Sequence, residues 1–447
     1  MRPRVLKSRT PEFRKFLAAM VARRGGDSAG VDSSVVKIID DVRKRGDRSL
    51  LDLTAKFDGV KLSLASLRVT PAERQSALNR IPHNDRDALE LAARRIADFH
   101  RRTMVEPFIY RDKSAMRLGQ MVTPIRRVGI YVPGGLGAYP SSVLMNAIPA
   151  KVAGVAEVAM VSPPSAEGER LSVLAAAEIA GVDEFYRVGG AHAVAALAYG
   201  TDTIAPVDKI VGPGNAYVQA AKRMVYGAVD IDKMAGPSEV LVIADDSAHP
   251  EWIAADLIAQ AEHGSGDEAA VLLTPSAAIA QRVADAVEKA LKTLPRARQV
   301  ETALGKRGAM VVVNDLNEAF DVANEIAPEH LELDLRSPSR WLPRVKAAGA
   351  VFLGSMTPAP LGDYLAGPNH VLPTGGAARF ASPLGAYDFL KRTSIIEASM
   401  GAIAELGPTV AHLARMEGFE GHARSIELRN GAGKGKSKRA GGTRHAK

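Results

Sequence analysis

Short apolar runs that alternate with helical patterns constrain the fold of this chain most. The first series of runs comprises VGIYVPGG at 128–135, EVAMVSPP at 157–164, EFYRVGG at 184–190 and DKIVGPGN at 208–215. Helical spacing separates the later runs, at about 169–181, 191–199 and 216–225. Regular alternation of this kind is typical of parallel βαβ units.

A second series of apolar runs follows, again with helical spacers. Its members are SEVLVIADD at 238–246, EAAVLLTP at 268–275, GAMVVVND at 308–315 and GAVFLGS at 349–355. Two doubly wound sheets explain both series more economically than one very large sheet. The expected fold class is α/β, with two Rossmann-like domains that have an incomplete dinucleotide fingerprint and with small helical segments at both ends of the chain.

The order of the two series predicts a partition of the 447 residues. We expect an N-terminal helical segment at 1–27, a first α/β domain at 28–130 and 240–384, a second at 131–239, a C-terminal segment at 385–430 and a disordered basic tail at 431–447. The first domain is expected to carry most of the metal and catalytic residues, and the second to carry the cofactor loops.

The net charge of +8 comes mostly from the tail. Six of the net positive charges lie there without any acid, on Lys434, Lys436, Lys438, Arg439, Arg444 and Lys447. A segment rich in Gly, Ser and Lys cannot bury enough apolar surface to become ordered. We interpret it as a solubilising tail on a nearly neutral body, with nucleic-acid binding through the tail as the alternative.

Composition limits the chemistry that the chain can perform. It has no cysteine, which excludes disulfides, thiolate nucleophiles and cysteine-based zinc sites. Any metal must be held by His, carboxylate or amide groups. No long apolar window or cleavable signal is evident, so we expect a cytoplasmic protein without a membrane partner.

Glycine and proline cluster where the strands of both series end. No G-x-G-x-x-G follows a predicted strand, and no G-x-x-x-x-G-K-[ST] occurs. GPGN at 212–215 and YVPGG at 131–135 leave backbone accessible, as a cofactor loop does, but ordinary strand-to-helix turns favour the same residues. Ligands of open α/β sheets bind beyond the carboxyl ends of the strands, so these loops are candidate binding segments.

Two pairs of polar side chains are candidates for chemistry. Gln260 and His263 lie three residues apart at the end of a predicted helix and can hold a cation, although a histidine there also interacts with the helix dipole. Glu329 and His330 place an acid beside an imidazole, the combination needed for proton transfer near neutral pH. Neighbours on a strand point to opposite faces, so this pair shares a pocket only where the backbone is irregular.

Two further pairs lie closer to the C-terminus. Asp363 and His370 fall in LGDYLAGPNHVLPT, where the acid is either a ligand or base, or the cap of a turn. Glu417 and His422 fall on a predicted helix in EGFEGHARSIELR, where a solvated face is the alternative.

Together these segments resemble the histidinol dehydrogenase family over nearly the whole chain before the tail. The matching blocks, in the family's order, are TPIRRVGIYVPGGLGAYPSSVLMNAIPAKVAGV, LAYGT, DKIVGPGNAYV, AGPSEVLVIAD, QAEHG, APEHLEL, GDYLAGPNHVLPT and a closing EG-x-x-x-H. The resemblance implies a zinc-dependent enzyme of histidine biosynthesis, which oxidises L-histidinol to L-histidine through bound L-histidinal with two NAD.

The resemblance also implies a role for individual residues. It assigns one zinc to Gln260, His263, Asp363 and His422. It makes His330 the general base and Glu329 the activator of water. It assigns substrate contacts to Ser238, Tyr364, His370 and Glu417, besides the zinc ligands and Glu329, and dinucleotide contacts to Tyr131, His192 and Asn215. In the family the terminal segment crosses to the other chain of a homodimer, so Glu417 and His422 are expected to complete the partner's site.

One position departs from the family's pattern. This chain reads GGAHA, with His192, where the family usually has Gln. A single ring nitrogen cannot replace both the donor and the acceptor of an amide, so we expect a modest change in NAD affinity. The rival function is that of a paralogous zinc dehydrogenase for another polar primary alcohol, such as a sulfonated diol; Glu417, His370 and His422 argue against it because they suit an amino-imidazole substrate.

Overall fold

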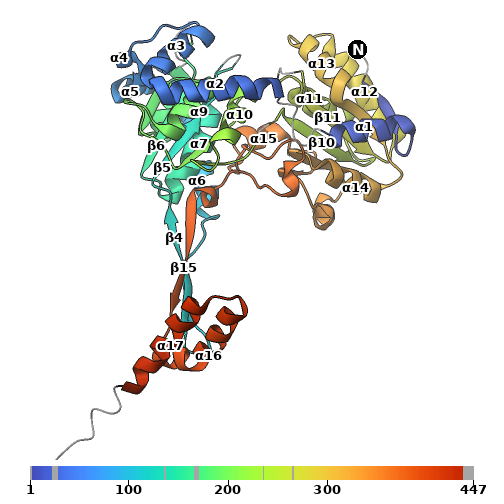
Figure 1. Ribbon diagram of the computed structural model, residues 1–447. Coiled ribbons are helices and arrows are strands. Elements are labelled where there is room, and N and C mark those ends of the chain that lie inside the picture. Colours follow the sequence, from blue (N-terminus) through green and yellow to red (C-terminus); the bar gives the residue numbers. More distant parts are fainter. Residues whose placement is uncertain are drawn as a thin grey trace, which may run out of the picture. The chain divides into compact units, whose positions relative to one another are not determined.

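The computed structural model describes residues 3–22, 29–134, 137–165, 171–234, 236–263 and 266–435. The chain divides into two compact units (Figure 1). The first unit comprises Met1–Thr103 and Ile125–Phe389, and the second comprises Met104–Pro124 and Leu390–Lys447. Across the described ranges, no helix combines the length and apolar character that a membrane span requires.

The first sheet of the first unit has the strand order β2-β7-β6-β5-β8-β9. Its strands are β2 (Arg68–Val69), β5 (Arg127–Tyr131), β6 (Glu157–Ser162), β7 (Glu184–Arg187), β8 (Lys209–Val211) and β9 (Asp230–Ile231). All pairs are parallel except β2 with β7. From β7 to β9 the sheet follows the 3-2-1-4-5 order of a doubly wound fold, which reverses direction between β5 and β8.

The second sheet repeats this arrangement, in the order β1-β12-β11-β10-β13-β14. Its strands are β1 (Val5–Lys7), β10 (Glu239–Ala244), β11 (Ala269–Thr274), β12 (Gly308–Val312), β13 (His330–Asp334) and β14 (Ala350–Leu353). Every pair is parallel, and the order reverses between β10 and β13. The predicted pair of doubly wound sheets is therefore confirmed.

Helices accompany each sheet in sequence order. Those around the first sheet are α2 (Ala29–Arg45), α3 (Asp47–Phe57), α4 (Leu64–Leu67), α5 (Pro71–Arg80), α6 (His83–Arg101), α7 (Pro140–Ala153), α8 (Leu171–Ile179), α9 (Gly190–Tyr199) and α10 (Ala216–Val225). Those that belong with the second are α1 (Pro11–Val21), α11 (Pro250–Ala261), α12 (Ala277–Leu291), α13 (Ala297–Arg307), α14 (Leu316–Ile326) and α15 (Ala359–Tyr364).

The N-terminal helices pack against the helices of the first sheet. Helix α2 contacts α9 and α10, α5 contacts α8, and β2 extends the sheet at β7. Helix α9 is rich in alanine, and its small buried side chains let α2 and α3 approach closely. This packing differs from the expected partition, which grouped residues 28–130 with 240–384; the other domain borders stay predictions.

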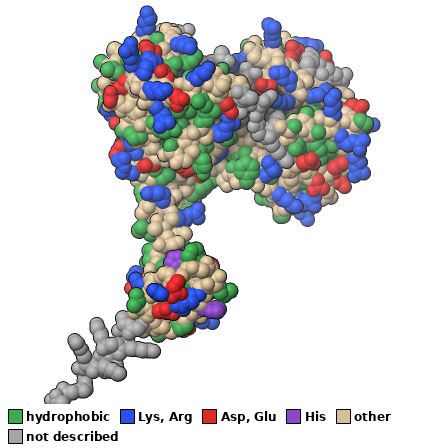
Figure 2. All heavy atoms as spheres, in the orientation of Figure 1, with side chains coloured by type: hydrophobic (Ala, Val, Ile, Leu, Met, Phe, Trp, Pro, Cys, Tyr) green, Lys and Arg blue, Asp and Glu red, His purple; other side chains and the backbone are tan. Residues whose placement is uncertain are grey.

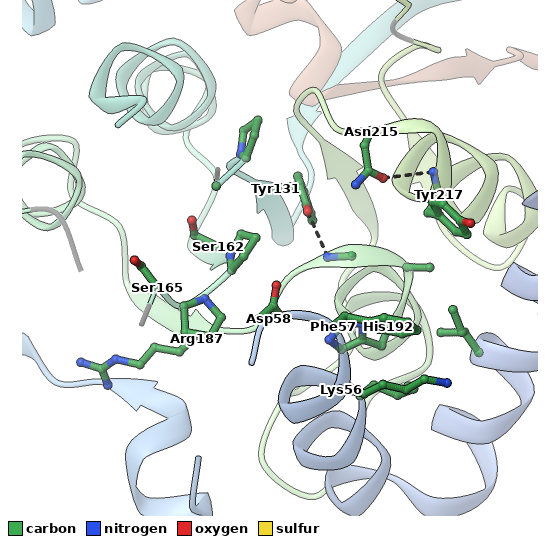
Figure 3. Close-up of a pocket in the computed structure, with 18 of the residues that line it drawn as sticks. Lys56, Phe57, Asp58, Tyr131, Ser162, Ser165, Arg187, His192, Asn215 and Tyr217 are labelled. Atoms are coloured by element: carbon green, nitrogen blue, oxygen red, sulfur yellow. Dashed lines mark hydrogen bonds between the residues drawn. The ribbon is translucent and has the colours of Figure 1, made fainter. Parts of the chain in front are cut away.

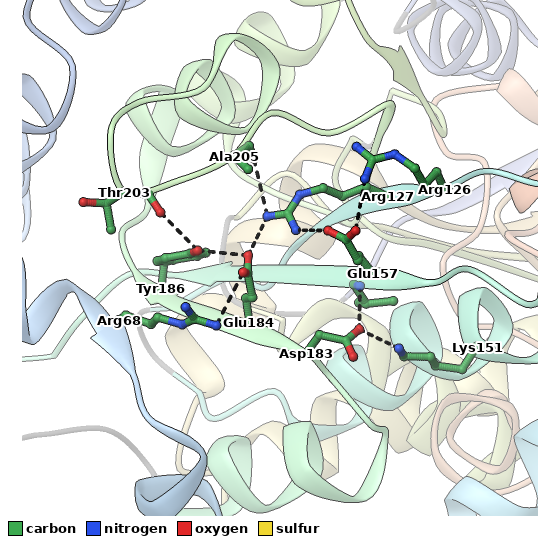
Figure 4. Close-up of polar contacts among 11 residues, drawn as sticks. Arg68, Arg126, Arg127, Lys151, Glu157, Asp183, Glu184, Tyr186, Thr203 and Ala205 are labelled. Carbon is green, nitrogen blue, oxygen red and sulfur yellow. Dashed lines mark hydrogen bonds and ion pairs between the residues drawn. The ribbon is translucent and has the colours of Figure 1, made fainter.

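A buried arginine joins the amino ends of three strands in the first sheet (Figure 4). The side chain of Arg127, which begins β5, is only 3% exposed; it donates to Glu157 of β6 at 2.6 Å and to Glu184 of β7 at 2.5 Å. Two carboxylates offset the cost of burying the guanidinium. This network stabilises the sheet at the end opposite to the strand ends where ligands bind in such folds.

The second unit contains an antiparallel sheet that we did not predict. Its strands are β3 (Phe108–Arg111), β4 (Arg117–Pro124) and β15 (Leu390–Glu397), in the order β15-β4-β3. Helices α16 (Met400–Met416) and α17 (Glu420–Gly435) pack together through Ala411, Ala414 and Ala423. Helix α17 extends into the expected tail as far as Gly435, and residues 436–447 lie outside the described residues.

Candidate active site

Two cavities of the first unit contain most of the predicted site residues. The His330 pocket, of about 910 Å³, is lined by Ser238, His263, Glu329, His330, Asp363, Tyr364 and His370, among others. The Tyr131 pocket, of about 1130 Å³, is lined by Tyr131, His192 and Asn215, among others. The two cavities share Pro133, Gly137 and Ala138, so they adjoin along this segment.

Glu329 and His330 face the same pocket although they are neighbours in the chain. Helix α14 ends at Ile326, and Ala327 adopts a left-handed conformation (φ 55°) before Pro328. Both side chains are buried, and His330 Nδ1 lies 3.7 Å from Glu329 Oε2. The irregular backbone that the pair requires is therefore present before β13.

One residue of β10 holds both side chains of the pair through its backbone. The N–H of Glu239 donates to Glu329 Oε2 at 2.9 Å, and its carbonyl oxygen lies 2.9 Å from His330 Nδ1. A carbonyl oxygen only accepts, so Nδ1 carries the proton and the neutral ring keeps Nε2 as its acceptor. Nε2 is buried without a hydrogen-bond partner among the described residues and lies 3.7 Å from Asp363 Oδ1.

Burial and neighbouring charges shift the pKa values of both groups. Burial raises the pKa of Glu329 to about 7, against the lowering effect of the His330 charge. Burial acts to lower the pKa of His330, but the Glu329 and Asp363 carboxylates outweigh it, so the pKa is raised overall. An acid whose pKa lies near neutrality can gain and lose a proton at little cost.

Asp363 and His370 both line the His330 pocket and are joined by a hydrogen bond. Asp363 and Tyr364 end α15, and His370 Nδ1 donates to the carbonyl oxygen of Asp363 at 2.8 Å. Burial acts to raise the pKa of Asp363, but the surrounding rings of His330, His370 and His263 lower it overall, so the carboxylate is ionised. An ionised carboxylate among imidazoles is a typical metal or cation ligand.

Gln260 and His263 lie on and just beyond the end of α11. Gln260 is buried at 5% exposure, and its Nε2 has no hydrogen-bond partner among the described residues. His263 follows the last helical residue, Ala261, and lines the His330 pocket. The two residues and Asp363 supply amide, imidazole and carboxylate donors, all of which zinc accepts.

The other two predicted residues belong to the second unit. Glu417 caps α16 and His422 lies in the first turn of α17, so they occupy different helices rather than the single helix expected. Neither lines the His330 pocket. Throughout the described part of the chain, no three His, Cys, Asp or Glu side chains gather closely enough to hold a metal ion.

Figure 3 shows how the predicted dinucleotide residues lie in the Tyr131 pocket. The hydroxyl of Tyr131 accepts from the N–H of Gly190 at 3.0 Å. Asn215 caps α10, with Oδ1 accepting from the N–H groups of Tyr217 and Val218 at 3.0 and 3.1 Å. Only its amide nitrogen therefore stays available to a ligand.

Sequence reasoning missed the group that shapes the loop before Asn215. Asp232 Oδ2 accepts from the N–H of Gly212, while Lys222 Nζ donates to the Gly212 carbonyl oxygen and to Asp232 Oδ1. Gly212 itself has φ 109°, and a Cβ there would lie 2.2 Å from the Tyr131 carbonyl oxygen. The buried ion pair and the glycine fix the loop close to β5.

Comparison with known proteins identifies the family. A family model described as histidinol dehydrogenase matches residues 21–430. The chain is 53% identical over 428 residues to a histidinol dehydrogenase of Syntrophotalea carbinolica, covering 95% of this chain and 99% of that one. It is 51% identical over 422 residues to one of Dechloromonas aromatica, with coverage of 94% and 96%.

A solved structure leads to the same family. The fold is similar to a crystal structure of histidinol dehydrogenase from Elizabethkingia anophelis, with a TM-score of 0.91 and 33% identity over 97% of this chain and 99% of that one. The protein is thus an oxidoreductase built on two doubly wound sheets. It belongs to the histidinol dehydrogenase family.

Proposed function

We propose that this enzyme oxidises L-histidinol to L-histidine with two NAD, in a zinc-dependent reaction. The observation that carries the proposal is the couple of Glu329 and His330, held by the backbone of Glu239 and facing a cavity that Asp363 and His263 also line. An amino alcohol that carries an imidazole offers nitrogen donors to a metal beside this couple.

Zinc would be held by Gln260, His263 and Asp363 of one chain and, in a homodimer, by His422 of the partner subunit. Buried Gln260 supports this donor set, because its Nε2 makes no hydrogen bond within the described residues that would fix the amide in another orientation, and its Oε1 is the atom that would bind the metal. Bound zinc would supply a template that orients the substrate's nitrogens.

The protein's own side chains carry out the proton transfers of both oxidations. His330 Nε2 takes the hydroxyl proton as hydride leaves the alcohol carbon for NAD, which gives the aldehyde. Glu329 takes a proton from the water that adds to this aldehyde, and His330 acts again as the second hydride leaves the hydrated carbon. One alcohol, one water and two NAD give one carboxylate, two NADH and three protons.

The dinucleotide is assigned to the Tyr131 pocket. This pocket lies at the carboxyl ends of β5 and β8, where the strand order of the first sheet reverses, and it adjoins the His330 pocket through Pro133, Gly137 and Ala138. Asn215, which caps α10, and Tyr131, whose hydroxyl accepts from a backbone N–H, lie along this edge. They offer polar groups to the dinucleotide.

Counting products tests the function. Purified, zinc-loaded enzyme with limiting L-histidinol and excess NAD is expected to form about two NADH per substrate, since one base serves both rounds. Absorbance of NADH and amino-acid analysis of L-histidine measure the two products. One NADH per substrate, or turnover of a sulfonated diol in preference to L-histidinol, would favour the rival paralogue.

Restoring the family's usual residue at position 192 should change the affinity for NAD modestly. His192 is 1% exposed, its Nε2 lies 3.3 Å from Thr54 Oγ1, and burial lowers its pKa to about 4, so the ring is neutral at pH 7. The His192→Gln variant adds a donor and an acceptor on one group, and we expect NAD to bind roughly 3- to 10-fold more tightly. Equal dissociation constants by calorimetry would remove this role from position 192.

A further inference from the structure

The Tyr131 pocket has one end that is remote from the chemistry. Residues of α2 and α3, among them Lys37, Leu53 and Lys56, line this pocket, and none of them lines the His330 pocket. The nicotinamide must reach the His330 pocket to accept hydride. The half of the dinucleotide that lies between α2, α3 and Tyr131 is therefore the adenosine half.

A carboxylate faces this remote end without a partner. Asp58 follows the last residue of α3, and Figure 3 shows its carboxylate pointing toward Tyr131. Its Oδ2 is buried and has no hydrogen-bond partner among the described residues. Burial raises the pKa of Asp58 to about 6, which reflects the cost of keeping an unpaired charge there.

The neighbouring cations do not neutralise this carboxylate. Arg187 donates to Glu73 at 2.6 Å and to the carbonyl oxygen of Ser66 at 2.9 Å. Lys56 places its ammonium group 5.1 Å from the ring centre of Phe57. A ligand that enters this end therefore meets an acceptor that has kept its negative charge and lacks donors.

We propose that Asp58 accepts hydrogen bonds from the adenosine ribose hydroxyls and thereby selects NAD over NADP. The inference rests on the proposed use of NAD. Ribose hydroxyls supply donors that the Asp58 carboxylate, which lines the pocket, does not find in the described protein, whereas a 2′-phosphate would bring two negative charges against it. An acidic residue commonly plays this part in Rossmann folds, where it follows a strand; here it comes from a helix outside the βαβ units.

The test measures binding to the free enzyme, so it does not depend on turnover. The probes are ADP-ribose and its 2′-phosphate, titrated by calorimetry into the wild type and the Asp58→Asn variant. We expect the wild type to prefer ADP-ribose, and the variant to bind it roughly 10- to 100-fold more weakly, because a hydrogen bond to a charged acceptor is lost. Affinity for the 2′-phosphate should stay the same or rise.

Asp52→Asn is the matched control. Asp52 lies on the same helix, is exposed, and pairs with Arg45 at 2.6 Å. We expect this variant to bind both probes as the wild type does. The melting temperature of Asp58→Asn should equal or exceed that of the wild type, since the substitution removes an unpaired buried charge.

The outcomes separate this inference from the proposed function. Suppose that the wild type binds ADP-ribose, and that Asp58→Asn lowers the affinity for both probes equally or leaves both affinities unchanged. The assignment of Asp58 is then overturned, and the use of NAD stands. A variant that melts well below the wild type and loses both probes together would show a structural role, which also overturns it. If the wild type binds neither ADP-ribose nor NAD, both proposals fail.

Discussion

The His330→Asn variant is expected to form NADH from L-histidinol roughly 10²- to 10⁴-fold more slowly than the wild type. Asparagine can keep the hydrogen bond that His330 Nδ1 donates to the Glu239 carbonyl oxygen, but it has no counterpart of Nε2. The substitution therefore removes the proton acceptor while retaining the contact that positions the side chain. Steady-state assays that follow NADH give kcat and KM separately.

The effect should lie in kcat and leave binding of both substrates nearly intact. His83→Asn is the control, because His83 is an exposed histidine at the start of α6 that does not line the His330 pocket. Its kcat should match that of the wild type. A His330→Asn enzyme with wild-type kcat would contradict the role of His330 as base, whatever its effect on zinc content.

The two doubly wound sheets could be predicted because their strands are buried on both faces. All five residues of β5 and all six of β10 are buried, so after the charged residue that begins each strand, Arg127 or Glu239, the strand reads as a continuous apolar run. The strands of the second unit lack this signal: β3 is exposed along its length, and β4 and β15 are mostly exposed or half-buried. Their pairing depends on backbone hydrogen bonds, which no side-chain pattern records.

The candidate site could be predicted only as far as side chains identify it. Glu329 and His330 were recognised as an acid beside an imidazole, yet Glu239 holds both through its N–H and carbonyl groups, which every residue type possesses. Asp58 precedes β5 by a long stretch of chain, and only the packing of α3 against α9 brings it to Tyr131. Distant segments such as these meet only through tertiary packing, which the local sequence pattern does not show.

The surface agrees with the charge distribution along the chain. On the face shown in Figure 2, basic and acidic side chains are interspersed over the first unit. Most of the excess of positive charge comes from lysines and arginines of the last fourteen residues, beginning at Lys434. Interspersed charges of both signs favour solubility, whereas a basic stripe would favour nucleic acid.

The His422→Ala variant is expected to lose zinc and activity together. With its imidazole removed, the proposed site keeps Gln260, His263 and Asp363, and we expect zinc to bind at least about 100-fold more weakly. Zinc content after dialysis, measured by mass spectrometry, and NADH formation should fall in parallel. His412→Ala, which replaces another histidine of the second unit, exposed on α16, is the control and should keep both. Normal zinc content in His422→Ala would contradict the assignment.

Mixing two inactive variants shows which chain supplies this ligand. In our proposal His422 of the partner subunit completes each site, so a dimer of one His330→Asn chain and one His422→Ala chain has one site with both defects and one with neither. Random pairing of equal amounts makes half of the dimers mixed, and recovery should approach about a quarter of wild-type activity. If each chain used its own His422, every site would keep one defect and the mixture would stay inactive.

Co-expression with two affinity tags isolates the mixed dimer, whose activity should be about half that of the wild type, because one of its two sites is intact.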